Sequence, residues 1–235
     1  MASIYKQKLN IIIWTTTFIA LFLCFISIPN FALDFISDAL TRSAIKKSID
    51  RTLDQYLCDL SDSNEWKKND IKIAYIMGGN QESLENRVHL SAKLYRTGAI
   101  EKVLTLSRDG ITEYSPELRR NLTNNEWILR LLESNGISKS HIELIDFKSG
   151  FFGTLTEIRG LMKLCSERNW HHIVIISSGY HTARIEATAK GLNLASVTTY
   201  KICGSSEQTS FFGSFREFCK LLSYRNIIIP IYCSG

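Results

Sequence analysis

Several common functional motifs are missing from this sequence of 235 residues. The formal net charge is only +5, and the basic residues form no runs and do not alternate with aromatic residues, as a nucleic-acid-binding surface would require. The six cysteines show neither CxxC spacing nor a pair of histidines beside them, as a structural zinc site would require. The sequence therefore argues against a nucleic-acid partner, and we predict no metal site.

Two signatures of α/β enzymes are also incomplete. The pair Gly78-Gly79 lacks the third glycine of the GxGxxG fingerprint, which weakens the case for a dinucleotide. The pair Ser177-Ser178 does not stand in a GxSxG elbow, which weakens the case for a serine nucleophile. Because neither motif is complete, the sequence does not identify a cofactor.

A long apolar segment lies near the N-terminus, because no charged residue occurs from Leu9 to Leu33. About 20 such residues, at a rise of ~1.5 Å each, span the hydrocarbon core of a bilayer. A cleaved signal peptide is the alternative, but its apolar core is usually only ~7–15 residues long. We therefore predict a retained signal anchor and expect the lipid bilayer to be a partner.

The orientation of this segment is ambiguous by charge, because Lys6 and Lys8 precede it while four basic residues between 42 and 51 follow it. The short N-terminal tail is typical of a signal anchor, so we predict an N-terminus in the cytoplasm and a domain outside. A domain in an oxidising compartment could contain a disulfide, although the sequence alone does not establish which cysteines would pair.

The distribution of apolar and charged residues divides the chain into three parts: a tail and membrane anchor at 1–33, a helical juxtamembrane connector at 34–70, and an α/β domain at 71–235. In the last part, short apolar runs alternate with longer amphipathic ones, which predicts a doubly wound, mostly parallel sheet of Rossmann-like type. The expected strands are Ile71–Met77, Lys102–Ser107, His141–Ile145, His172–Ser177 and Ala195–Lys201. The expected helices are Ser83–Thr97, Asn124–Asn135, Thr154–Arg168, His181–Lys190 and one near Ser214–Ser223.

Polar residues concentrate after the expected strands, where ligands of open parallel sheets bind. Gly78, Gly79 and Asn80 follow the first strand, and glycine allows backbone NH groups to approach a ligand closely. Arg87 falls about one turn into the next helix, from which it could reach the same crevice. An ordinary turn and a solvated arginine are the structural alternatives.

Two glutamates permit two interpretations. The segments 123–126 and 154–157 both fit the capping box, in which a threonine caps a helix and Glu126 or Glu157 bonds back to the cap. Each glutamate would also lie at the rim of the crevice, where it could transfer protons. The two roles are compatible.

The segment 173–184 carries the strongest functional signal, because a buried strand leads directly into a polar turn and a helix. His181 and Arg184 are three residues apart, so they share a helix face and can converge on one ligand. Histidine can act as acid or base near neutral pH, and arginine binds phosphate or carboxylate. The alternative is a helix N-terminus that contains a hydrogen-bonded histidine.

The order of these residues resembles a known family. The residues that carry the resemblance are Gly78, Gly79, Arg87, Glu126, Thr154, Glu157, Ser177, Ser178, Tyr180, His181 and Arg184. Over residues 71–222 the chain resembles the YdcF-like family, which includes the envelope proteins SanA and ElyC. Departures from the family pattern are Arg108-Asp109-Gly110 after Ser107, Gly153 before Thr154, and Thr182-Ala183 after His181.

The resemblance implies a Rossmann-like domain that is tethered to the inner membrane, exposed to the periplasm and involved in envelope barrier function or cell-wall precursor metabolism. We predict a site with His181, Glu126 and Glu157 as catalytic residues. The predicted ligand-binding residues are Gly78, Gly79, Asn80, Arg87, Ser107, Thr154, Ser177, Ser178 and Arg184. The expected ligand is an anionic small molecule or a lipid-linked, phosphorylated precursor. A non-catalytic protein that senses a nucleotide or metabolite is the alternative.

Overall fold

The computed structural model describes residues 49, 73–147, 153–207 and 210–233, all within one compact unit, Lys47–Gly235. The predicted membrane anchor and nearly all of the predicted connector lie outside the described residues. Within the described ranges, no helix combines the length and apolar character that a membrane crossing requires.

The centre of the domain is a five-stranded sheet in which every neighbouring pair of strands is parallel. Its strands are β1 (Ile73–Ile76), β2 (Lys102–Leu106), β5 (Ile142–Ile145), β6 (His172–Ser178) and β7 (Thr199–Ser205). The order across the sheet is β5-β2-β1-β6-β7. These strands are rich in isoleucine, leucine and valine, as expected for strands that are covered on both faces.

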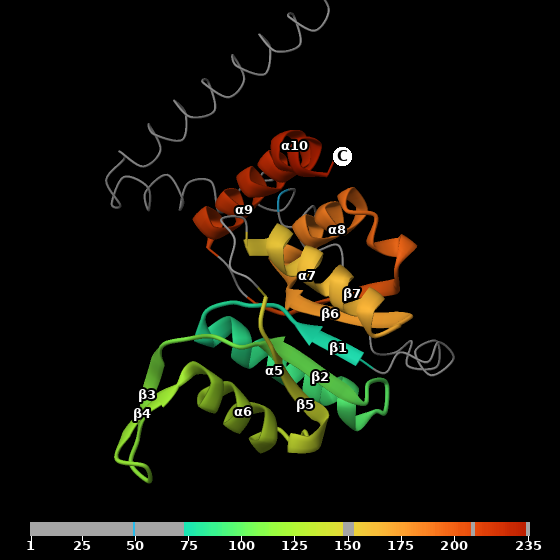
Figure 1. Cartoon of the computed structure of the whole chain (residues 1–235). Helices are drawn as coiled ribbons and strands as arrows, with labels where there is room; N and C mark the ends of the chain where they lie inside the picture. Colours follow the sequence, from blue (N-terminus) through green and yellow to red (C-terminus); the bar gives the residue numbers. More distant parts are fainter. Residues whose placement is uncertain (1–48, 50–72, 148–152, 208–209, 234–235) are drawn as a thin grey trace, which may run out of the picture. The chain divides into compact units, whose positions relative to one another are not determined.

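Helices cover both faces of the sheet (Figure 1). Successive side chains of a strand point to opposite faces, so Ala74 and Ile76 of β1 join one apolar core while Tyr75 and Met77 join the other. The first core is completed by α5 (Gln81–Arg96) and α6 (Asn124–Ser134), and the second by α7 (Gly153–Glu167) and α8 (Thr182–Gly191). The predicted α/β fold with a parallel sheet is therefore confirmed.

The strand order creates a switch point between β1 and β6. From β1 the chain builds outward through β2 to β5, and it then returns to place β6 and β7 on the other side of β1. The helices that follow β1 and β6 consequently lie on opposite faces of the sheet. In open parallel sheets ligands bind beyond the carboxyl ends of the strands at such a point, and we call this region the crevice. This topology brings together residue segments that are about 100 positions apart in the sequence.

A hairpin after β2 was absent from the sequence-based prediction. It consists of β3 (Ile111–Ser115) and β4 (Arg120–Thr123), which pair in antiparallel fashion outside the main sheet. Ile111 is 70% exposed and Tyr114 is 59% exposed, so the hairpin contributes little to the apolar core.

The last strand, which the sequence predicts at Ala195–Lys201, lies four residues later, at Thr199–Ser205. Asn193 adopts a left-handed conformation with a φ of 54°, and a short 3₁₀ helix, η4 (Leu194–Ser196), follows before β7 begins at Thr199. The C-terminal helix α9 (Phe211–Ser223) continues into a π-helical turn, η5 (Tyr224–Ile228), and into α10 (Ile229–Tyr232). Short 3₁₀ helices also precede β5 and α8, namely η2 (Lys139–His141) and η3 (Gly179–His181).

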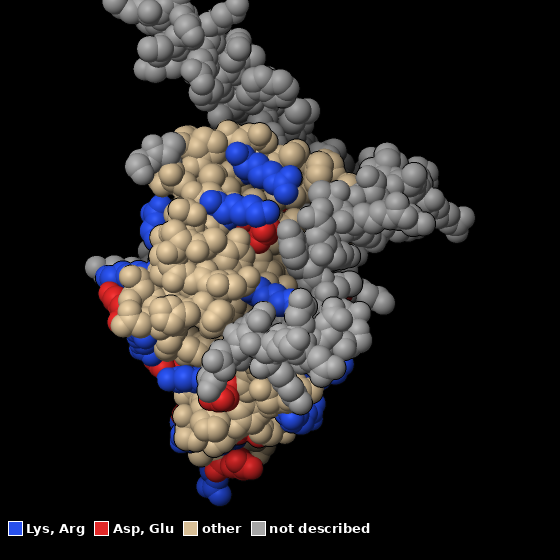
Figure 2. Space-filling model, turned by 90° about the vertical axis from the view of Figure 1, so that its right-hand side faces the viewer, with Lys and Arg blue, Asp and Glu red and all other residues tan. Residues whose placement is uncertain are grey.

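The surface visible in Figure 2 carries dispersed charges. Lysine and arginine side chains are interspersed with aspartate and glutamate and with large areas of other residues on this face. This view shows no continuous basic patch.

Candidate functional site

The crevice between β1 and β6 is supported from below by Arg87. Its side chain is only 1% exposed. One guanidinium nitrogen, Nη1, donates to the carbonyl oxygens of Met77 at 2.7 Å and Gly78 at 2.6 Å, and Nη2 donates to Ser178 Oγ at 2.5 Å. Arg87 therefore ties the end of β1 to the end of β6, and it lies beneath the crevice rather than over it.

Burial lowers the pKa of Arg87, although the nearby carboxylate of Glu207 opposes this effect. Glu207 Oε1 lies 3.9 Å from Arg87 Nε, and the carboxylate accepts hydrogen bonds from Ser83 and Ser205. Nε of Arg87 has no hydrogen-bond partner within the described chain. A buried cation of this kind stays charged because carbonyl dipoles and a carboxylate surround it.

The side chain of Glu157, a residue of α7, contacts the turn after β1. Its Oε2 accepts hydrogen bonds from the hydroxyl of Tyr75 at 2.8 Å and from the backbone NH of Gly78 at 3.0 Å. Burial, together with the carboxylate charge of Glu157, raises the pKa of Tyr75 well above its ordinary value. A carboxylate of the protein itself thus uses one of the backbone NH groups that the sequence pattern assigned to a ligand.

The capping interpretation of segment 154–157 is wrong in this structure. Helix α7 begins at Gly153, so Thr154 already lies inside the helix. Its hydroxyl accepts a hydrogen bond from Nη1 of Arg184 at 2.8 Å. Thr154 therefore joins helix α7 to the arginine of helix α8.

Arg108 lies across the glycine turn. Its Nη1 donates to the carbonyl oxygen of Gly79 at 2.7 Å, and its backbone NH donates to Asn125 Oδ1. A Cβ atom at Gly78 would collide with the Arg108 guanidinium, and one at Gly79 would lie 2.9 Å from Nη1 of Arg87. Arginine side chains therefore approach both glycines closely, but only Gly79 faces one that is buried and held in place.

His181, Arg184, Glu217 and Lys220 form one compact group of ionisable side chains. Glu217 Oε2 lies 2.8 Å from Nδ1 of His181 and 3.0 Å from Nη2 of Arg184, while Lys220 Nζ donates to Oε1 at 2.6 Å. Nη2 of Arg184 is also 2.9 Å from Nδ1 of His181. We call these four side chains the His181 cluster.

Burial and the contacts among these side chains together determine their charges. Burial lowers the pKa of His181, and the bond to Glu217 opposes but does not cancel this effect. Burial of Glu217 acts to raise the pKa of that carboxyl, but the bond from His181 and the charge of Arg184 hold it well below its ordinary value. Two cations thus face one carboxylate, so the His181 cluster carries one net positive charge when the imidazole is neutral.

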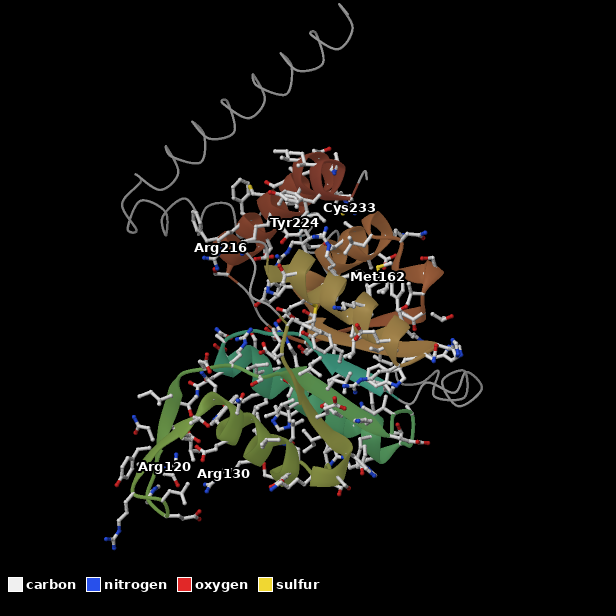
Figure 3. All side chains as sticks on the ribbon, viewed as in Figure 1. Arg120, Arg130, Met162, Arg216, Tyr224 and Cys233 are labelled. Atoms are coloured by element: carbon white, nitrogen blue, oxygen red, sulfur yellow. The ribbon has the colours of Figure 1, made fainter. Side chains whose placement is uncertain are left out.

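The ring of Tyr224 supports Arg184 from the C-terminal segment. The guanidinium carbon lies 5.3 Å from the centroid of the ring, and Tyr224 packs with Leu155 of α7. Figure 3 shows Tyr224 among the C-terminal helices and Arg120 at the hairpin, well apart.

Glu126 belongs to the region of the hairpin. Thr123 and Glu126 form the predicted capping box of α6, and the carboxylate also pairs with Arg120. The bond from Arg120 lowers the pKa of Glu126 to about 2. Its contacts are therefore those of a helix cap, and the structure does not bring it to the His181 cluster.

The remaining predicted residues have structural contacts around the crevice. Asn80 caps α5 by accepting a bond from the NH of Ser83. Ser107 accepts a bond from Asn125, and the carbonyl of Ser177 accepts one from Ser205. Within the described chain, no group of three or more His, Cys, Asp or Glu side chains is arranged to hold a metal ion.

Sequence reasoning missed four residues of the site: Arg108, Glu207, Glu217 and Lys220. Glu217 had a usable signal, because it is the only acidic residue after Glu207 and lies in an otherwise apolar and basic helix. Comparison of the chain with protein-family models, curated proteins and solved structures found no match. We therefore infer the function from the chemistry of this site.

Proposed function

We propose that this protein is a membrane-anchored envelope protein of the SanA and ElyC type, which binds or acts on a phosphorylated cell-wall or lipid-linked precursor. The observation that carries the proposal is the His181 cluster beside the carboxyl ends of β1 and β6. There a histidine that can exchange protons contacts Arg184, and Lys220 pairs with the same carboxylate of Glu217; cations of this kind stabilise phosphate oxygens.

The internal contacts indicate where an anion would bind. Arg87 gives its hydrogen bonds to the protein itself, and the NH of Gly78 is used by Glu157. Lys220, by contrast, is 45% exposed in its side chain, and His181 is 21% exposed. The proposal therefore places the anion over the His181 cluster, with Arg87 as support.

We propose an extracytoplasmic location for the domain, at the outer face of the inner membrane. The apolar segment at 9–33 supports a membrane anchor. Cys203 is disulfide-bonded, and disulfides persist in oxidising compartments such as the periplasm.

The test of the function is replacement of His181 by alanine and, separately, of Arg184 by alanine in the cell, followed by a measurement of envelope permeability. We expect both variants to admit a large antibiotic that the intact envelope excludes. Arg168→Ala is the matched control, because Arg168 pairs with Glu143 at the opposite edge of the sheet. Normal permeability in both site variants, at normal protein levels, would count against the proposal.

The alternative is a non-catalytic binding protein that uses the same site to sense an anionic metabolite. The observation that favours it is the extent to which the site's arginines already bond to the protein itself. Ligand binding that survives His181→Ala but is lost in Arg184→Ala, with no chemical change in the ligand, would establish this alternative.

A further inference from the structure

The arrangement of Glu217 and His181 fixes the position of a proton. Glu217 comes from α9, 36 residues after His181, and its side chain is only 4% exposed. Its carboxylate is held in place from three sides, by His181, by Arg184 and by Lys220. An acceptor with this support has little freedom to move away from the imidazole.

Two neighbours compete for Nδ1 of His181. Glu217 Oε2 lies at 2.8 Å and Nη2 of Arg184 at 2.9 Å. If Nδ1 carried no proton, its lone pair would face the carboxylate at hydrogen-bond distance, and this contact would be repulsive. If Nδ1 carries the proton, it donates to Glu217, while Nη2 of Arg184 donates to the same oxygen at 3.0 Å. The second arrangement satisfies all three groups.

The other imidazole nitrogen, Nε2, is then left with its lone pair. Among the described residues, the structure records no hydrogen-bond partner for Nε2. The charged and titratable groups around the ring are Glu217 and Lys220 of α9, Arg184 of α8, Arg87 of α5 and Tyr180 of η3. Burial and the two arginines favour the neutral imidazole, whereas Glu217 favours the charged one.

We infer that Glu217 is the positioning residue of a histidine base: it holds the proton of His181 on Nδ1 and so leaves Nε2 free to accept a proton. This inference rests on the proposed function for its ligand, a phosphate ester held by Arg184 and Lys220. A water molecule would give its proton to Nε2 as its oxygen bonds to phosphorus. The bond from phosphorus to the ester oxygen would break, and the imidazolium would return the proton to that oxygen.

The test is NMR spectroscopy of the full chain, labelled with ¹⁵N-histidine and held in detergent micelles, which reports which nitrogen of each imidazole carries the proton. We expect the wild-type protein to show His181 with a protonated Nδ1. Glu217→Met should move the proton to Nε2, because Arg184 would then be the only donor or acceptor left beside Nδ1. Glu217→Gln should keep the proton on Nδ1, since its amide oxygen still accepts, but it should lower the pKa of His181 further.

His141 provides an internal control, because Tyr95 and not Glu217 bonds to its Nδ1. The signals of His141 should be the same in every variant that folds. If Glu217→Met does not fold, Glu217→Gln still tests the inference. A wild-type His181 with its proton on Nε2, or a pKa of His181 that is unchanged in Glu217→Gln, would overturn the inference. The spectra are recorded without ligand. If the site variants show normal permeability while the spectra are as expected, the proposed function is refuted and the inference about Glu217 stands.

Discussion

The two adjacent glycines after β1 should respond very differently to the same substitution. A methyl group at Gly79 meets the guanidinium of Arg87 at 2.9–3.2 Å, and Arg87 is buried and held by three hydrogen bonds. A methyl group at Gly78 meets the guanidinium of Arg108, which is the far end of a partly exposed side chain, and lies 3.2 Å from Oε1 of Glu157, a contact that a shift of a few tenths of an ångström relieves. Arg87 cannot move aside without losing three hydrogen bonds, whereas the Arg108 guanidinium would lose only its bond to the carbonyl oxygen of Gly79.

The expected changes in the free energy of unfolding follow from these contacts. Overpacking a buried site costs about 1–3 kcal/mol, and each hydrogen bond of a charged group contributes about 1.5–3 kcal/mol. We therefore expect Gly79→Ala to lower the free energy of unfolding by about 2–3 kcal/mol. For Gly78→Ala, the bond from Arg108 to Gly79 belongs to a partly exposed side chain that water can solvate, so its loss costs about 0.5–1.5 kcal/mol, and a less flexible unfolded chain offsets about 0.4–1 kcal/mol of this. The net change should stay within about 1 kcal/mol.

The assay is thermal unfolding of the purified full chain in detergent, followed by circular dichroism. For a domain of this size, 1 kcal/mol corresponds to roughly 2–4 °C in Tm, so Gly79→Ala should lower Tm by about 4–12 °C. Neither glycine has a positive φ, so backbone strain does not obscure the comparison. Equal Tm values for the two variants, or a larger loss for Gly78→Ala, would refute the assigned role of Arg87.

Three further predictions concern single contacts. Tyr75→Phe should lower the free energy of unfolding by about 1–3 kcal/mol in urea titrations, because it removes a buried hydrogen bond to the carboxylate of Glu157. The bond from Arg168 lowers the pKa of Glu143 to about 2, so this pair stabilises the fold at neutral pH and loses its effect as the pH falls from about 4.5 to 2. Glu143→Gln should thus cost about 1 kcal/mol or less at pH 7 and nothing near pH 2, as measured by urea titration at each pH. Finally, in the denatured chain Cys203 should react with a maleimide only after reduction, and reaction without reduction would contradict the proposed location.

The sequence predicted the main sheet well because its strands are buried. Residues 173–176 form a continuous apolar run, and such runs mark strands that helices cover on both faces. The hairpin was missed because β3 and β4 are short, polar and mostly exposed, so they carry no comparable signal. The late start of β7 follows from the left-handed turn at Asn193, which no periodicity reveals.

For the site, local spacing was informative and distant contacts were not. His181 and Arg184 lie together as their spacing predicts, because a single helical turn determines their separation. Glu217 reaches the imidazole only through the path of α9, which depends on how the C-terminal helix packs on the sheet. Arg87 was expected over the crevice, but its burial depends on the position of two carbonyl groups that sequence patterns do not specify.

Phosphate binding by the His181 cluster underlies the proposed function, and isothermal titration of the full chain with inorganic phosphate measures it. Loss of a charge-assisted hydrogen bond costs about 1.5–3 kcal/mol, so Arg184→Met and Lys220→Met should each weaken binding by about tenfold or more. Lys163→Met, which removes an exposed charge from α7, should bind like the wild-type protein. No phosphate binding by the wild-type protein, or equal binding by all three variants, would contradict the account.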